Sequence, residues 1–335
     1  MTPTVRGTST ATHRGTSRRS GMVTRVSSAP CVSRPRRSRI CALAGLAHEA
    51  SAALAADLVR VAPKGLSRVF YTDDGSTSVE VAVKIALQTW QHLGSPKKSR
   101  FVALDGAYHG DTIECSSLGG VEVVRRPVAS VLFDCVRTPF PDPNAYERAF
   151  DAIRDIVLKE KDSIAAVIVE PLLQGTAGMG ATLATDRIYD AFRGGTDRAL
   201  WYGHTFCGNP IGAALAREVL AIYEDEGVVA QASAKGPRIA AGFERIAAIP
   251  GVARVRRLGM VGAADLEVGG GAPGGSGTSY LGWLGWRVFE EARKRGAYLR
   301  PLGDTVYVCR PLVIGEQDLD DLLCILEESV RAALA

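Results

Sequence analysis

The sequence of 335 residues contains no run of about 18 apolar residues, the length that a membrane-spanning helix requires. It also contains no Cys-x-x-Cys pair, although seven cysteines are scattered along it, and no second histidine or cysteine stands at metal-ligand spacing from another. These absences argue against a membrane span, a disulfide scaffold and a metal site. Together they predict a protein of a reducing compartment, with a cytoplasmic location.

Acidic residues are missing from the first part of the chain. Residues 1–48 hold nine arginines and no aspartate or glutamate. The chain has 40 basic residues in all, so 31 remain beyond this stretch against 36 acidic ones, and this body indicates no nucleic-acid partner. Residues 1–42 are also poor in large apolar side chains, which predicts a disordered arm. A transit peptide, a basic nucleic-acid arm and a mis-set reading frame all stay open as interpretations of it.

The character of the chain changes at Leu43, where apolar residues begin to recur at helical spacing. Short apolar runs alternate with helical stretches from there on, and this alternation predicts an α/β domain with a parallel, doubly wound sheet over residues 43–227. The predicted strands are 68–73, 100–106, 130–134 and 165–171, and the predicted helices are 43–63, 76–93, 144–160 and 209–227.

The remainder of the chain, 228–335, reads as a smaller α+β domain. A glycine-rich stretch at 269–279 predicts a loop, and helical patterns follow it at 282–296 and 316–335. Between these helices, residues 297–314 predict a hairpin that turns at Gly303 and Asp304.

Asp74, Gly75, Ser76 and Thr77 stand between a predicted strand and a predicted helix. The N-terminus of a helix offers free N–H groups and the positive end of the helix dipole, which suits a phosphate group. Gly75 would let the backbone approach a ligand, and Ser76 would add a hydroxyl. Simple capping of the helix by Asp74 explains the same residues without a ligand.

Three further positions are candidates for binding. Tyr108 follows a predicted strand, where an aromatic ring can stack on a planar ligand or merely close a loop. Thr205 lies in a turn before the helix that Pro210 opens, which suits a phosphate or is a plain loop. Arg300, before Pro301, could hold a carboxylate or be a surface arginine.

Taken together, these segments resemble the class III pyridoxal-phosphate-dependent aminotransferases, which have the fold-type-I architecture. The resemblance covers about residues 43–335. The motifs that carry it are GLAHEASAALAADLV, YTDDGSTSVEVAVKIA, GAYHGDT, VIVEPLLQGTAGM, ATLATDRIYDAF, GHTFCGNP and LRPLGDTVYV.

The resemblance implies pyridoxal 5'-phosphate as the cofactor and a homodimer that acts on small molecules. Gly75 and Ser76 would bind the cofactor phosphate, and Tyr108 would stack on its ring. Thr205 would reach the phosphate in the neighbouring subunit. Arg300 would hold the substrate carboxylate, with Tyr307 nearby.

The chain departs from this family at one place. No lysine occurs between Lys161 and Lys235, and Met179 runs directly into Gly180. The resemblance implies that the missing segment carries the Schiff-base lysine, the aspartate that pairs with the pyridinium nitrogen, and two central strands of the large-domain sheet. We therefore predict no catalytic residue, a split sheet and weak cofactor binding. Lys235 is rejected as a substitute because the resemblance places it on an ordinary surface helix.

The activity that the resemblance implies belongs to biotin biosynthesis: the amino group of S-adenosylmethionine moves to 8-amino-7-oxononanoate. The missing segment predicts that this chain performs the reaction poorly or not at all. Two alternatives stay open, a non-catalytic remnant that dimerises or binds the cofactor, and a class III aminotransferase with another substrate.

Overall fold

A computed structural model of the chain describes residues 43, 47–139, 146–170, 179–267 and 282–335. The predicted arm at 1–42 and the glycine-rich stretch at 269–279 lie outside the described residues. The described chain divides into two units, 43–220 and 221–335, and the division falls inside helix α8 (Pro210–Asp225). No helix of the described residues is both long and apolar enough to cross a membrane.

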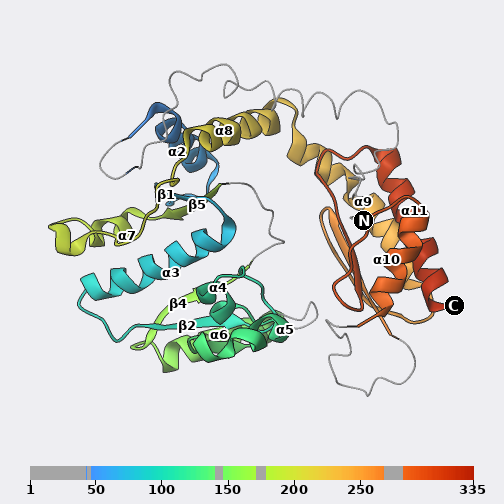
Figure 1. Cartoon of the computed structure of the whole chain (residues 1–335), viewed down its shortest axis with the longest axis horizontal. Helices are drawn as coiled ribbons and strands as arrows, with labels where there is room; N and C mark the ends of the chain where they lie inside the picture. Colours follow the sequence, from blue (N-terminus) through green and yellow to red (C-terminus); the bar gives the residue numbers. More distant parts are fainter. Residues whose placement is uncertain (1–42, 44–46, 140–145, 171–178, 268–281) are drawn as a thin grey trace, which may run out of the picture. The chain divides into compact units, whose positions relative to one another are not determined.

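The strands of the first unit form two separate sheets (Figure 1). In one, β1 (Arg68–Thr72) pairs antiparallel with β5 (Gly180–Ala184). In the other, β2 (Arg100–Leu104) lies between β3 (Val136–Thr138) and β4 (Ile164–Ile168), and all three strands are parallel. The α/β class is therefore as expected. The single parallel sheet predicted from the strand–helix alternation is wrong, because among the described residues β1 pairs only with the antiparallel strand β5. Two separate sheets agree with the split sheet that was also predicted.

Helix α3 (Gly75–His92) follows β1 and packs on β1, β5 and β4. A small apolar core lies around Leu54 of α2 (Glu49–Val61), Tyr71 of β1 and Ala213 of α8. The Tyr71 hydroxyl donates a hydrogen bond of 2.7 Å to the Ser51 carbonyl, which satisfies a phenol inside this core. The other helices of this unit are α4 (Ile113–Leu118), α5 (Glu122–Arg125), η1 (Arg126–Val131), α6 (Tyr146–Lys159), α7 (Asp186–Ala191) and η2 (Thr196–Arg198).

One predicted strand of this unit is wrong. Residues 130–134 were expected to form a strand, but η1 ends at Val131 and β3 begins only at Val136. Pro127 stands at the start of η1, where its fixed φ suits a helical turn. The apolar run at 130–133 therefore precedes β3 instead of forming a strand, and Phe133 packs against the core around Phe101.

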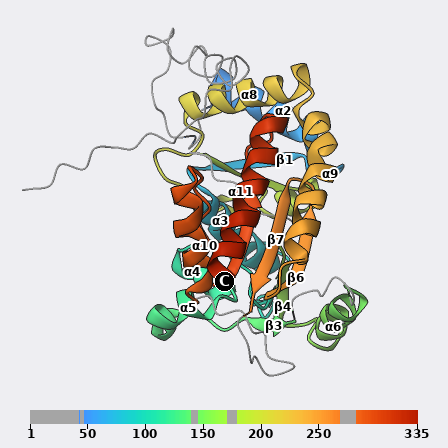
Figure 2. The same cartoon turned by 90° about the vertical axis from the view of Figure 1, so that its right-hand side faces the viewer.

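The second unit is an antiparallel sheet in the order β6 (Val252–Leu258), β7 (Val261–Leu266), β8 (Thr305–Cys309), with three long helices. Helix α9 (Val228–Ala247) packs on β6, β7 and α11 (Glu316–Leu334), and α10 (Leu284–Lys294) packs on α11 (Figure 2). This α+β arrangement agrees with the predicted class. Its largest buried side chains include Phe243, Ile239, Leu266, Leu319, Leu323 and Leu326.

The predicted hairpin at 297–314 is only partly correct. A tight turn does occur at Gly303, whose φ is +59°, and a single bridge joins Leu302 to Thr305. However, β8 pairs with β7 rather than with residues 297–300. The hairpin of this unit is β6–β7, which turns at Gly259 and Met260 and was not predicted.

Candidate functional site

Helix α3 begins with a complete capping box. The Asp74 side chain accepts a 2.8 Å hydrogen bond from the Thr77 backbone N–H, and the Asp74 backbone N–H donates to the Thr77 hydroxyl at 3.2 Å. Such a cap stabilises a helix by about 1 kcal/mol. The predicted strand–cap–helix order is therefore confirmed for these residues, and their capping role is real whether or not a ligand binds.

The cap leaves two backbone donors at this helix end available. In the part of the chain that the structure describes, no hydrogen bond uses the N–H groups of Gly75 and Ser76, because helix geometry gives the first turn no carbonyl partners. A side chain built at Gly75 would meet nothing within 4 Å, so this side of the turn is open. These two amides and the Ser76 hydroxyl are thus suited to an anion.

The segment after β2 closes over the same turn. A Cβ atom built on Gly110 would lie 2.2 Å from the Ser76 hydroxyl oxygen, so Gly110 permits an approach that no other residue allows. The Cys115 thiol donates to the Ser76 carbonyl at 3.3 Å. Ser76 is therefore contacted by Gly110, in the loop that also carries Tyr108, and by Cys115 of α4. Tyr108 itself is 39% exposed.

His109, between Tyr108 and Gly110, is buried. Burial, and secondarily the charge of Arg137, lower the pKa of its imidazole, so the neutral form is favoured. Its Nε2 atom has no hydrogen-bond partner among the described residues. A neutral, enclosed imidazole is suited to a packing role at this position.

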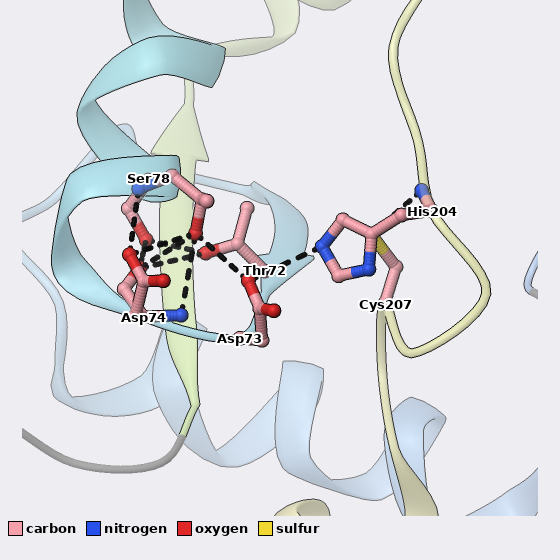
Figure 3. A network of polar contacts seen from close by, with 7 residues as sticks. Thr72, Asp73, Asp74, Ser78, His204 and Cys207 are labelled. Atoms are coloured by element: carbon pink, nitrogen blue, oxygen red, sulfur yellow. Dashed lines mark hydrogen bonds and ion pairs between the residues drawn. The ribbon is translucent and has the colours of Figure 1, made fainter. Parts of the chain in front are cut away.

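The turn that contains Thr205 also lies beside the residues that precede α3. His204 Nε2 lies 3.3 Å from an Asp73 carboxylate oxygen, within ion-pair distance although not in hydrogen-bond geometry (Figure 3). The Cys207 sulfur accepts the His204 backbone N–H at 3.5 Å. Thr205 itself is exposed. The structure therefore brings Gly75, Ser76, Gly110 and the 204–207 turn together.

Sequence reasoning missed a polar row along α3. Ser76, Glu80 and Lys84 recur every fourth residue and so share one helix face. Lys84 Nζ lies 4.7 Å from the centre of the Tyr202 ring. Burial, and then the neighbouring Glu114, raise the pKa of Glu80. The regular four-residue spacing was the signal that could have revealed this row.

The predicted substrate residues belong to the unit 221–335. Arg300 is exposed and directly precedes Pro301, while Tyr307 is half-buried in β8 opposite Ala263. The contacts described for both residues lie within that unit. Their predicted role in binding the substrate therefore stays a prediction.

The reason given for rejecting Lys235 is wrong. Lys235 is not on a surface helix face: it is buried in α9, and its ammonium donates a 3.0 Å hydrogen bond to the Leu312 carbonyl. The rejection itself stays a prediction. A lysine engaged with a backbone carbonyl inside its own unit has a structural use, which is an independent reason against a covalent role.

These residues fit one end of pyridoxal phosphate and not the other. Two free amides, a hydroxyl and an open glycine at a helix N-terminus suit the phosphate. The aldehyde of the cofactor needs a lysine amine, and no lysine lies between Lys161 and Lys235. In the described part of the chain, no group of three histidine, cysteine or acidic residues could hold a metal ion.

Comparison with known proteins assigns the chain to a family. The family description "Aminotransferase class-III" matches residues 33–182 and 175–330. The chain therefore belongs to the class III aminotransferases, which use pyridoxal phosphate.

Within this family the chain is similar to adenosylmethionine-8-amino-7-oxononanoate aminotransferases. It is 32% identical to that of Synechococcus elongatus over 352 residues, which cover 83% of this chain and 80% of the relative. It is 29% identical to that of Geobacter sulfurreducens over 368 residues, covering 86% and 80%.

Solved structures have the same fold. The adenosylmethionine-8-amino-7-oxononanoate aminotransferase of Methanocaldococcus jannaschii aligns with a TM-score of 0.81 at 23% identity, covering 93% of this chain and 84% of that one. An amine transaminase from an uncultivated Pseudomonas species, solved with pyridoxal phosphate bound as the internal aldimine, aligns with a TM-score of 0.82 at 23% identity, covering 93% and 87%.

Proposed function

We propose that this chain derives from an enzyme that transfers the amino group of S-adenosylmethionine to 8-amino-7-oxononanoate, a step of biotin biosynthesis. The observation that carries the proposal is the 32% identity to the Synechococcus elongatus protein of that name over 83% of this chain. Several other relatives with the same name match over similar shares. Arg300 and Tyr307 would then meet the oxononanoate substrate.

We further propose that the polypeptide lacks an internal segment of its family at Met179–Gly180. The alignments to two relatives span 352 and 368 positions, more than the 335 residues of this chain, so those relatives contain residues without a counterpart here. The two family matches meet at 175–182. The strands on either side, β4 and β5, belong to different sheets. These three observations support a gap at one point.

Such a gap impairs the reaction for a chemical reason. Pyridoxal phosphate acts as an electron sink for amino-group transfer, and the enzyme supplies a lysine that holds it and moves protons. This chain keeps Gly75, Ser76 and Tyr108 for binding and orientation. It has no lysine between Lys161 and Lys235 that could act together with them. Weak, reversible cofactor binding with little or no turnover is the function that the site supports, close to that of a cofactor-binding remnant.

Borohydride reduction tests the missing lysine. The purified chain is mixed with pyridoxal phosphate, reduced, digested and mapped, with the Synechococcus elongatus relative treated in parallel. We expect labelling spread over several surface lysines of this chain and one stoichiometric adduct in the relative. A single stoichiometric adduct in this chain, together with product formed from S-adenosylmethionine, would overturn the proposal.

Calorimetric titration tests the remaining phosphate cradle. The chain should bind pyridoxal phosphate weakly, and the Ser76→Ala, Tyr108→Ala double variant should bind it more weakly still. Pyridoxal without its phosphate serves as the control ligand and should not distinguish the two proteins through Ser76. Equal binding by both proteins, or none by either, contradicts the proposed cradle.

A homodimer is also proposed, since exposed Thr205 could then reach the phosphate bound by the other subunit. Sedimentation measures this directly. A monomer at all concentrations would contradict it.

A further inference from the structure

The strands on either side of Met179–Gly180 have free edges. Within the described residues, β4 pairs only with β2, and β5 pairs only with β1. Consecutive strands of one chain usually neighbour each other in one sheet. Here β4 and β5 are consecutive, yet each is the edge of a different sheet. An unpaired strand edge presents a row of N–H and C=O groups that can bind a further strand.

The β4 edge lacks the features by which proteins protect such edges. Its sequence, Ile-Ala-Ala-Val-Ile, contains no charged residue and no proline. Val167 is 37% exposed although it lies within the strand. One carbonyl is already capped: the Trp90 indole N–H donates to Ala165 O at 2.8 Å, at the point where the β2–β4 register shifts. No other described strand pairs with this side of the rest of β4, through Ile168.

Helix α3 holds both edges. Its Trp90 binds the β4 backbone, and the Ser78 carbonyl accepts a 2.9 Å hydrogen bond from the Thr182 hydroxyl of β5. The two edge strands are therefore attached to one helix, and no strand of the described residues lies between them. This attachment lowers the entropy that an incoming segment must overcome, because the flanking strands need no separate ordering.

We propose that the edges of β4 and β5 accept a strand segment from a second polypeptide, namely the internal segment that the longer relatives carry between their counterparts of Met179 and Gly180. The edge of β4 suits an extended segment that adds a strand by backbone hydrogen bonds, as β2 does on its other side. This inference rests on the proposed gap in the chain. Pairing of β4 with β4 of another copy is the competing use of the same edge.

The test uses the full chain and a synthetic fragment with the internal residues of the Synechococcus elongatus relative between its counterparts of Met179 and Gly180. Native mass spectrometry measures the complex, and hydrogen exchange maps the protected amides. We expect a 1:1 complex with slowed exchange at Ile164–Ile168 and Gly180–Ala184. Absence of a complex, protection confined to other residues, or a β4-mediated homodimer that excludes the fragment would each overturn the inference.

A charge on the edge provides the matched variant. Val167→Lys should weaken fragment binding by roughly tenfold or more, since several backbone hydrogen bonds then form beside an unpaired charge. Leu158→Lys is the control, because Leu158 is 64% exposed on α6 and lies off the strand edge, and it should bind as the parent does. Circular dichroism verifies that both variants fold. Equal weakening by the two lysines would contradict the edge as the binding surface.

The outcome is independent of the lysine test. If the chain alone gives a single stoichiometric lysine adduct, the proposed gap is wrong whatever the fragment does. If it gives none and the fragment does not bind, the gap stands and only the strand-addition inference fails.

Discussion

The replacement Gly110→Ala tests how the candidate phosphate turn is held. The new Cβ would lie 2.2 Å from the Ser76 hydroxyl oxygen, 2.9 Å from its Cβ and 3.1 Å from its Cα. Rotation of the hydroxyl relieves only the first of these contacts, so the first turn of α3 must shift. Overpacking of this kind costs about 1–3 kcal/mol. Gly110 also has a φ of +124°, where a residue with a side chain costs about 1–3 kcal/mol more.

The matched control is Gly106→Ala in the same loop. Gly106 has a φ of +72° but open space around it, so its replacement adds only the backbone cost, about 1–2 kcal/mol. Urea unfolding followed by circular dichroism should show a lower midpoint for Gly110→Ala than for Gly106→Ala. The Gly110 variant should also bind pyridoxal phosphate more weakly, because Ser76 is displaced. Equal midpoints for the two variants, or an unchanged Gly110→Ala protein, would refute the close approach.

Three further predictions concern charge. Burial lowers the pKa of His109, so the contribution of its neutral form to stability is fully present above pH 6.5, the ordinary value, and is lost as pH falls below 6.5. The His109→Gln variant should therefore show a flatter dependence of the urea midpoint on pH below 6.5 than the parent. Burial raises the pKa of Tyr202 to about 12 from 10.0, so its stabilising effect is present below pH 10 and lost as pH rises through about 12. The ultraviolet difference between parent and Tyr202→Phe should therefore show almost no phenolate signal at about pH 10.5, which lies between the two values. Asp265→Ala should lower the free energy of unfolding of the C-terminal unit by about 1–3 kcal/mol, measured by urea unfolding, because its buried carboxylate accepts a 2.6 Å hydrogen bond from the Thr305 hydroxyl and pairs with Arg256. The control Arg331→Ala, which removes one partner of a more exposed ion pair, should change this free energy little.

Local signals in the sequence determined much of the first unit. The capping box at Asp74 and Thr77 satisfies backbone groups within four residues, so its formation needs no distant partner. The long amphipathic helices α3, α6 and α8 follow from apolar spacing for the same reason. The absence of lysine between Lys161 and Lys235 is likewise a property of the chain alone.

Only the tertiary structure decided how strands pair and which side chains meet. Pairing of these strands depends on partners far along the chain, so β1 joining β5 across more than a hundred residues, and β8 joining β7 rather than residues 297–300, left no local trace. The approach of Gly110 to Ser76, the contact of His204 with Asp73 and the burial of Lys235 are of the same kind. They depend on packing between elements, whereas periodicity reports only which face of one element is apolar.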